Sequence, residues 1–240
     1  MLKDGTRHAT GYRAGEFANP YEILTDAGHG VVVATPNGVT PTVDMMSLRP
    51  EMVGGNDSAL ELEAIIRSTE VMRRPLQLSD VRLEDYDAVY LPGGHGPMAD
   101  LAWDTDMGRL LTRQLASGNA LFIVCHGPAA VLATRIHGES PFKGYNITCF
   151  TDEEEDGVGL ASRAPWLLET TPSCRNPPPM EQQHRHRNDL TSSNALPIKN
   201  YSCRVHLLQV IPRAERGLPS SSCDQFFVVT LRFSITCMSY

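Results

Sequence analysis

The chain of 240 residues contains no hydrophobic run long enough to span a membrane, and its first residues lack the apolar core of a signal peptide. Basic residues are also few and form no stripe. The chain has 21 lysines and arginines against 28 acidic residues, a formal net charge of −7. This balance argues against nucleic acid or an anionic membrane as the main partner. We therefore expect a cytoplasmic protein that binds neither nucleic acid nor a membrane.

Cysteine is scarce as well, and six cysteines are too few for a disulfide scaffold at this length. Cys125 and Cys149 fall in predicted strands, where we expect reduced thiols. The other four lie after residue 170 and raise the question of a zinc site with nearby histidines. Their spacings match no closed zinc site, so we expect no metal. The residues weighed for that site are Cys174, His184, His186, Cys203 and His206.

Up to residue 170, apolar strands alternate with helical patterns. This alternation is typical of an α/β fold in which helices flank a doubly wound, mostly parallel sheet, as in flavodoxin. The chain is long enough for one such domain with a sizeable core, and its 41% of hydrophobic residues is ordinary for it. We predict strands at 31–35, 87–92, 121–125 and 146–150, and helices at 15–28, 57–73, 106–118 and 128–136.

The composition changes near Thr170, after which the chain is polar, rich in proline and without a clear period. We therefore assign 1–170 to the α/β domain and 171–240 to an atypical, largely disordered tail. Only residues 223–237 of the tail resemble a strand. As an alternative to disorder, residues 225–236 could pair with the edge of the sheet and substitute for a missing strand.

Cys125 stands at a change of pattern, in the run LFIVCHGPAAVLA. A predicted strand ends there, Gly127 follows two residues later, and a small-residue helical pattern begins. Such a turn lifts one side chain above the sheet and points the first N–H groups of the helix at a reacting atom. These donors favour a thiolate. The pattern predicts a nucleophile elbow at Cys125, and the alternative is a cysteine that is simply buried.

A glycine pair ends another predicted strand at the same edge of the sheet. Gly93 and Gly94 follow residues 87–92, so that backbone N–H groups can approach a ligand closely. We expect the N–H groups of Gly94 and His126 to form an oxyanion hole facing Cys125. The alternative is that the glycine pair is only a tight turn.

Carboxylates near the predicted site occur in two places. Five consecutive acids, Asp152 to Asp156, follow residues 146–150. Charge runs are usually solvated or lie at helix N-termini, but one of these acids could orient His126. Glu16 opens the first predicted helix and, taken alone, is an ordinary surface glutamate.

Several separated motifs occur in one order along residues 5–170 and resemble the ThiJ/PfpI superfamily, which has a class I glutamine amidotransferase-like fold. The resemblance is to the branch of glyoxalase III-like and chaperone-like proteins. The motifs are DGTRHATGY, GEFANPY, AGHGVVVATPNGVTPTVD, YDAVYLPGGHGPMADL, VCHGPAAVLA, PFKGYNITCFTDEEE and APWLLE. Several motifs in one order are more specific than any single one.

The resemblance implies roles for particular residues. Cys125 would be the nucleophile and His126 its neighbour in the site. Glu16 would be the buried carboxyl beside the sulfur, where burial would favour a bound proton. Glu155 matches the third acid, although the acidic run leaves the register open by one or two residues.

The same resemblance implies a reaction, in which methylglyoxal and related 2-oxoaldehydes become 2-hydroxy acids such as D-lactate without glutathione or another cofactor. The partner would be the small aldehyde, and the family's members are often homodimers. One alternative is a holdase chaperone or stress protein whose exposed cysteine senses redox state. Amide hydrolysis is a weaker alternative function. His126 directly follows the nucleophile in sequence, so we expect that its ring would not easily reach the sulfur as a general base.

A third alternative is a truncated, catalytically defective product. Members of this branch begin with a strand before the TGY segment, and this strand lies in the middle of their sheet. The chain starts after it. Loss of a central strand would leave backbone donors and acceptors on both neighbouring strands unpaired, each at a cost of about 1–3 kcal/mol if buried.

Overall fold

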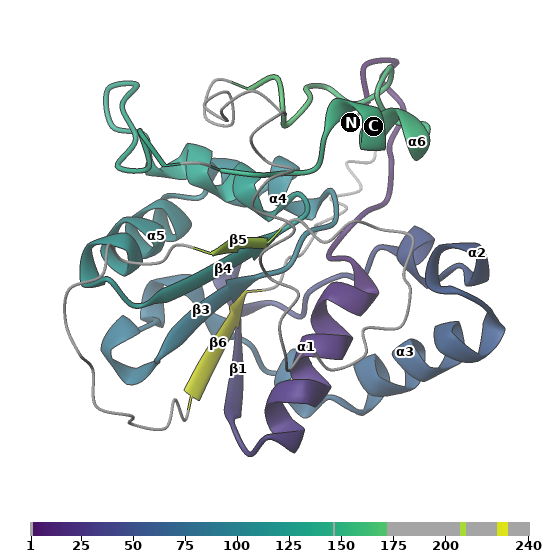
Figure 1. Cartoon of the computed structure of the whole chain (residues 1–240), viewed down its shortest axis with the longest axis horizontal. Coiled ribbons are helices and arrows are strands. Elements are labelled where there is room, and N and C mark those ends of the chain that lie inside the picture. The colour runs from purple at the N-terminus through teal and green to yellow at the C-terminus, as the bar shows by residue number, and fades with distance from the viewer. Residues whose placement is uncertain (1, 146, 172–206, 210–224, 230–240) are drawn as a thin grey trace, which may run out of the picture.

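The computed structural model describes residues 2–145, 147–171, 207–209 and 225–229. They form an α/β fold around a six-stranded sheet with the spatial order β2-β1-β6-β3-β4-β5 (Figure 1). Neighbouring strands are parallel, except that β5 runs antiparallel to β4. The strands are β1 (Gly30–Thr35), β2 (Leu76–Gln77), β3 (Ala88–Leu91), β4 (Ala120–Val124), β5 (Leu207–Gln209) and β6 (Gln225–Val229).

Helices surround the sheet in the described residues, and none of them is both long and apolar enough to cross a membrane. The α-helices are α1 (Ala14–Asp26), α2 (Pro50–Val53), α3 (Asn56–Ser68), α4 (Gly96–Ala99), α5 (Thr105–Ser117) and α6 (Asp152–Gly157). The 3₁₀-helices are η1 (Pro36–Gly38), η2 (Met45–Leu48), η3 (Glu70–Met72), η4 (Leu78–Asp80), η5 (Leu83–Asp85), η6 (Leu101–Trp103) and η7 (Gly127–Thr134).

The core lies on both faces of the sheet, because successive residues of a strand point to opposite sides. On one face, Val31 and Val33 of β1 share a buried cluster with Phe17 of α1. On the other, Val89 of β3 shares a cluster with Leu111 of α5. The α/β fold predicted from the sequence, with helices flanking a mostly parallel sheet, is therefore confirmed.

Two predicted elements differ from the structure. The helix predicted for 128–136 is the 3₁₀-helix η7. The strand predicted for 146–150 is wrong, because residues 147–150 form no strand and Phe150 instead donates its N–H to the Cys125 carbonyl at 3.0 Å. The edge of β4 next to this segment is occupied by β5, which pairs with residues 122–124.

β6 comes from the far end of the chain and lies in the interior of the sheet (Figure 1). It runs parallel to β1 on one side and to β3 on the other. The segment therefore does not take the edge position considered from the sequence. The division of the chain at residue 170 stays a prediction, because most of residues 171–240 lie outside the described part. So do the residues weighed for zinc, which are Cys174, His184, His186, Cys203 and His206.

The variant Val228→Pro should abolish the cooperative thermal transition. Proline removes the N–H of residue 228 from a strand that has neighbours on both sides. Each buried backbone group left unpaired costs about 1–3 kcal/mol, against a total stability of roughly 5–15 kcal/mol. Far-UV circular dichroism during heating measures the effect, and Val228→Thr, which keeps the N–H, is the control. Equal transition midpoints for the two variants would contradict the interior position of β6.

Candidate active site

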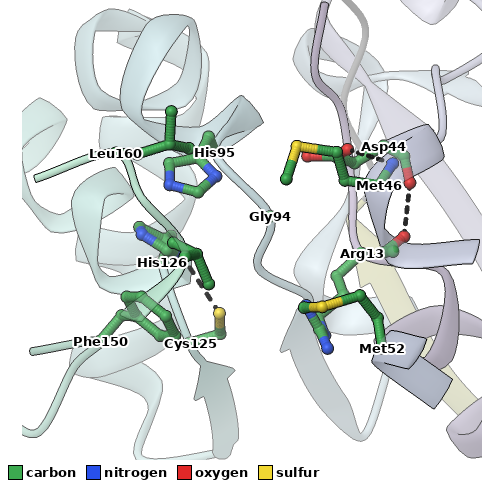
Figure 2. Close-up of a pocket in the computed structure, with 12 residues that line it drawn as sticks. Arg13, Asp44, Met46, Met52, Gly94, His95, Cys125, His126, Phe150 and Leu160 are labelled. Carbon is green, nitrogen blue, oxygen red and sulfur yellow. Dashed lines mark hydrogen bonds between the residues drawn. The ribbon is translucent and has the colours of Figure 1, made fainter. Parts of the chain in front are cut away.

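Cys125 follows the last residue of β4, where the chain turns toward η7 (Figure 2). Its backbone has φ +55°, a left-handed conformation that residues other than glycine rarely adopt. The residue is only 7% exposed. Gly127 allows the turn to close, since a Cβ there would lie 2.6 Å from Ile123 Cγ2. The turn has the strained strand-to-helix geometry of a nucleophile elbow.

Gly93 lies where three groups of the site meet. A Cβ at this position would lie 2.5 Å from Cys125 Cβ, 2.7 Å from the His126 nitrogen and 2.8 Å from Glu16 Oε2. The Gly93 N–H donates to Glu16 Oε2 at 2.7 Å, so in this structure it holds the carboxyl. Gly94 has φ +87° and lines one pocket together with Cys125. The oxyanion role of the Gly94 and His126 N–H groups stays a prediction.

Glu16 reaches the site from the first turn of α1. The Arg13 N–H donates to the Gly93 carbonyl at 3.1 Å, and the Tyr90 hydroxyl donates to the Glu16 carbonyl at 2.8 Å, so α1 is tied to β3. Burial raises the pKa of Glu16, although Arg13 and hydrogen bonds with Gly93 and Cys125 oppose the change. Glu16 is thus a partly buried carboxyl beside the sulfur, with its side chain 15% exposed, not an ordinary surface glutamate.

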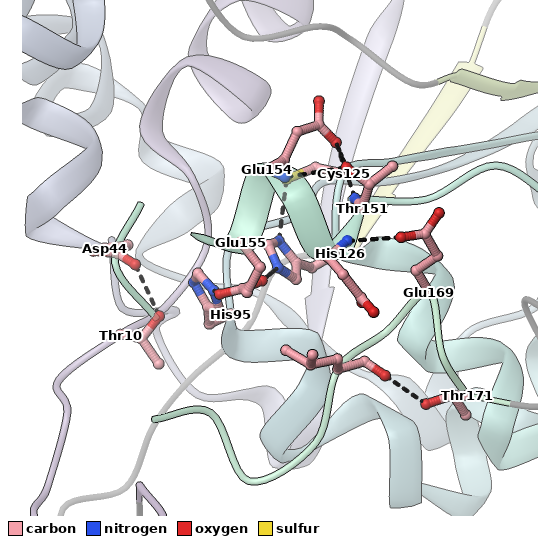
Figure 3. A network of polar contacts seen from close by, with 12 residues as sticks. Thr10, Asp44, His95, Cys125, His126, Thr151, Glu154, Glu155, Glu169 and Thr171 are labelled. Carbon is pink, nitrogen blue, oxygen red and sulfur yellow. Dashed lines mark hydrogen bonds and ion pairs between the residues drawn. The ribbon is translucent and has the colours of Figure 1, made fainter. Parts of the chain in front are cut away.

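His126 contacts the nucleophile and an acid at once (Figures 2 and 3). Its Nδ1 lies 3.2 Å from Cys125 Sγ, and its Nε2 lies 2.8 Å from Glu155 Oε2. The ring packs on Phe150, with 4.3 Å between the ring centroids. The expectation that this ring would not reach the sulfur is therefore wrong. The left-handed backbone of Cys125 lets two consecutive side chains lie on the same side of the turn.

Helix α6 determines which acid of the run at 152–156 points into the site. A capping box starts this helix at Thr151, whose hydroxyl accepts the Glu154 N–H at 3.1 Å, while Glu154 Oε2 accepts the Thr151 N–H at 2.9 Å. The helix then turns Glu155 inward, where it is 3% exposed, whereas Asp156 is exposed. Glu155 is the acid of the run that bonds to His126.

His95 is a further member of this cluster, which the sequence analysis missed. Its Nε2 lies 2.6 Å from Glu155 Oε1, so the two oxygens of one carboxylate each contact a different histidine (Figure 3). The rings of His95 and His126 are 4.1 Å apart between centroids. The available signal was the position of His95 directly after the glycine pair, at the end of a predicted strand.

The charges of the cluster follow from its burial. Burial lowers the pKa of His126 to about 4, His95 adds to the effect and Glu155 opposes it. Burial would raise the pKa of Glu155, but hydrogen bonds from His126 and His95 outweigh it and bring the value down to about 2. At neutral pH the carboxylate is charged and His126 is neutral. With Nε2–H donating to Glu155, the Nδ1 lone pair faces Cys125 and can accept the thiol proton.

The pocket at Cys125 has a volume of about 40 Å³ (Figure 2). Because a cavity volume of about 10–15 Å³ is enough to hold one water molecule, this space suits a small substrate group. Polar and apolar side chains lie on both sides of it in Figure 2. Its lining includes Arg13, Asp44, Gly94, His95, Met46, Met52, Phe150 and Leu160.

The donor set of His95, His126 and Glu155 is also one that a divalent metal can use, since one ligand atom from each lies within 4.8 Å of the others. In this structure the same atoms bond to one another. A metal there would replace the hydrogen bond that directs Nδ1 of His126 toward the sulfur. The chemistry described below therefore uses these residues without a metal.

Comparison with known proteins identifies the family. A family model described as ThiJ/PfpI family-like matches residues 8–153 of the sequence. The chain belongs to the ThiJ/PfpI-like family. It is 29% identical over 180 residues to the protein/nucleic acid deglycase HchA of Staphylococcus aureus strain Newman, a match that covers 70% of this chain and 60% of that protein. The chain thus spans about 60% of the length of the curated relatives it matches.

Solved structures agree with this assignment. Glyoxalase III from Candida albicans superimposes with a TM-score of 0.54 at 26% identity, covering 67% of this chain and 66% of that one. A rapid encystment protein of Francisella tularensis superimposes with a TM-score of 0.56 at 24% identity, covering 71% and 73% of the two chains. This second likeness concerns the fold alone.

Protonation of His126 should destabilise the folded chain. Its pKa is about 4 in the fold against an ordinary value of 6.5, so the unfolded state binds the proton first as the pH falls. The free energy of unfolding should therefore fall between about pH 6.5 and pH 4. Urea unfolding at a series of pH values measures this, and His126→Gln should lack that part of the pH dependence.

The control for this measurement is His137→Asn, which replaces an exposed histidine with a residue that tolerates the same left-handed backbone, φ +52°. It should keep the pH dependence of the unmodified chain. If His126→Gln also keeps it unchanged, then His126 is not the buried neutral ring that the structure shows.

Proposed function

We propose that the chain is a cysteine-dependent enzyme of the glyoxalase III type, which converts methylglyoxal and related 2-oxoaldehydes to 2-hydroxy acids without glutathione. One observation supports this most directly. Cys125 is contacted both by Glu16, a partly buried carboxyl of raised pKa, and by the ring of His126, which is paired with the charged carboxylate of Glu155. Such a set supplies a base for the thiol and a separate carboxyl that can exchange a proton with the substrate.

The first step is addition of the thiol to the aldehyde. His126 Nδ1 takes the proton of Cys125, and the sulfur forms a bond with the aldehyde carbon while the carbonyl π-bond breaks. The resulting oxyanion lies near the backbone N–H groups of Gly94 and His126 and takes the proton that His126 Nδ1 removed from the thiol. The product is a hemithioacetal that keeps the neighbouring ketone.

The second step moves hydrogen between the two substrate carbons. A base takes the proton from the carbon that carries sulfur while the neighbouring ketone oxygen gains a proton, which gives an enediol. The neighbouring carbon is then protonated, and the hydroxyl on the sulfur-bearing carbon loses its proton as the thioester carbonyl forms. Glu16 is the residue positioned for this transfer, because its carboxyl hydrogen-bonds with Cys125 and its raised pKa makes it a stronger proton acceptor than an ordinary glutamate. One carbon is oxidised to a thioester and the other is reduced to an alcohol, so no external oxidant or reductant is needed.

The third step is hydrolysis of the thioester. Water adds to the thioester carbonyl, the carbon–sulfur bond breaks, and the 2-hydroxy acid leaves with Cys125 restored. His126 can assist by taking a proton from the water, as it did from the thiol, and Glu155 stabilises the ring while it is charged. Methylglyoxal gives lactate by this route.

The named activities of similar proteins support this proposal. One similar solved structure is a glyoxalase III, and the curated relatives are named protein/nucleic acid deglycases. Release of an aldehyde from an adduct is therefore the second candidate, and it would use the same nucleophile and base. The burial of Cys125, at 7% exposure, disfavours the redox-sensor alternative, which requires an accessible thiol.

The variant Cys125→Ser should lose methylglyoxal consumption while its thermal transition stays within a few degrees of the unmodified chain. The hydroxyl is close in size to the thiol but does not ionise near neutral pH. Loss of methylglyoxal and formation of lactate are measured together. Cys149→Ser, at the other buried cysteine of the described residues, is the control and should keep activity. More than a tenth of the activity remaining in Cys125→Ser would exclude Cys125 as the nucleophile.

The variant Glu16→Gln should slow turnover by roughly 10²–10⁴-fold, the usual effect of losing a general acid–base group. The amide keeps the shape of the side chain and can still accept the Gly93 N–H. Alkylation of Cys125 by iodoacetamide should persist, which separates loss of proton transfer from loss of the nucleophile. Unchanged turnover would mean that Glu16 serves only to hold the glycine turn.

A further inference from the structure

A second cavity, of about 290 Å³, adjoins the catalytic pocket. His95 and Leu160 line both spaces and lie next to each other above Cys125 in Figure 2. The mechanism above uses only the small pocket and leaves this larger space without a role. Drug-sized and cofactor-sized ligands occupy clefts of about 300–1,000 Å³, so the second cavity is large enough for a substantial substituent.

The walls of this cavity are mostly apolar and include both tryptophans of the chain. Trp103 and Trp166 meet edge to face, with 6.3 Å between their ring centroids, and Trp103 is 66% exposed. Met98 and Ala164 beside them are buried. Paired indole rings at a cavity wall favour a flat, aromatic ligand.

One polar atom in this lining has no partner. The Nε2 of His8 is buried and makes no hydrogen bond within the described residues. The His8 ring lies edge-on to His95, with 6.4 Å between the ring centroids. Burial lowers the pKa of His8, so the ring is neutral and Nε2 can donate or accept one hydrogen bond, according to its tautomer. A buried polar atom left unpaired is costly, which favours a ligand with a matching polar group.

Residues 2–10 and 160–166, together with α4 and η6, thus enclose one space. We propose that this cavity binds an aryl substituent of the substrate that carries a hydrogen-bonding group, with the ring against Trp103 and Trp166 and the polar group on His8. The aldehyde would then reach Cys125 past His95. This inference rests on the proposed function and assigns its preferred substrates as aryl-substituted 2-oxoaldehydes.

Binding can be tested without catalysis, because 4-hydroxyacetophenone carries the ring and hydroxyl but has no aldehyde. The chain has two tryptophans, so the ¹⁵N-labelled protein gives two indole N–H signals, both from this cavity. Both signals should shift on titration with this ketone. If one or both signals fail to shift at a saturating concentration of the ketone, the proposal is overturned.

A blocking variant with a matched control locates the site. Ala99→Phe puts a ring into the cavity from an exposed position of α4, and Ala116→Phe makes the same change at an exposed position of α5 away from it. The shifts should disappear in Ala99→Phe and remain in Ala116→Phe. Equal binding by both variants would show that the ketone binds elsewhere and would overturn the assignment.

Turnover then tests the substrate class. For the unmodified chain, kcat/KM for 4-hydroxyphenylglyoxal should exceed that for methylglyoxal by at least about tenfold, since even one methylene in a pocket is worth about that factor. His8→Leu should reduce the advantage of the hydroxylated over the plain phenylglyoxal by roughly three- to tenfold, while His8→Asn, which keeps a hydrogen-bonding group, restores part of it.

The outcomes separate the two proposals. If the ketone binds as expected but no aldehyde is consumed, the proposed function fails and the cavity assignment holds. If methylglyoxal is consumed but the indole signals do not shift and aryl substrates have no advantage, the cavity assignment fails and the proposed function holds.

Discussion

The site depends on the empty space at Gly93, where a side chain would overlap Cys125, His126 and Glu16 at once. The ends of β3 and β4 approach closely only because this residue has no Cβ. Its N–H holds the Glu16 carboxyl, and its carbonyl accepts the Arg13 N–H at the start of α1. The backbone of Gly93 therefore holds the Glu16 carboxyl of α1 close to Cys125 at the end of β4.

Two carboxyls near the same sulfur have opposite electrostatic surroundings. Glu16 has its pKa raised mainly by burial, whereas two histidines lower the pKa of Glu155 far enough to keep it charged. Pairs of acids driven apart in this way can divide acid and base roles at one pH. His95 contributes by occupying the second oxygen of Glu155, which fixes the carboxylate plane toward His126.

Local patterns were enough to predict the elbow, because Cys125 and Gly127 are neighbours and the turn is set by a few residues. Within the acidic run, the resemblance pointed to Glu155, but only the position of the capping box at Thr151 decides which acid turns inward. The strand predicted at 146–150 does not form, because the edge of β4 pairs with β5, a segment far away in sequence that local patterns do not reveal. His95 was missed because its partner is 60 residues away in sequence.

The last strand in sequence also bears on the geometry of the reacting groups. β1 is not paired with β3 directly, since β6 lies between them. Helix α1, which carries Glu16, leads into β1, while Gly93 and Cys125 follow β3 and β4, which pair with each other. The spacing between carboxyl and sulfur is therefore set by the width of β6 as well as by the local contacts of Arg13 and Tyr90. β6 therefore lies between the strand that follows the helix of Glu16 and the two strands whose ends carry Gly93 and Cys125, so that both parts of the site depend on this one strand.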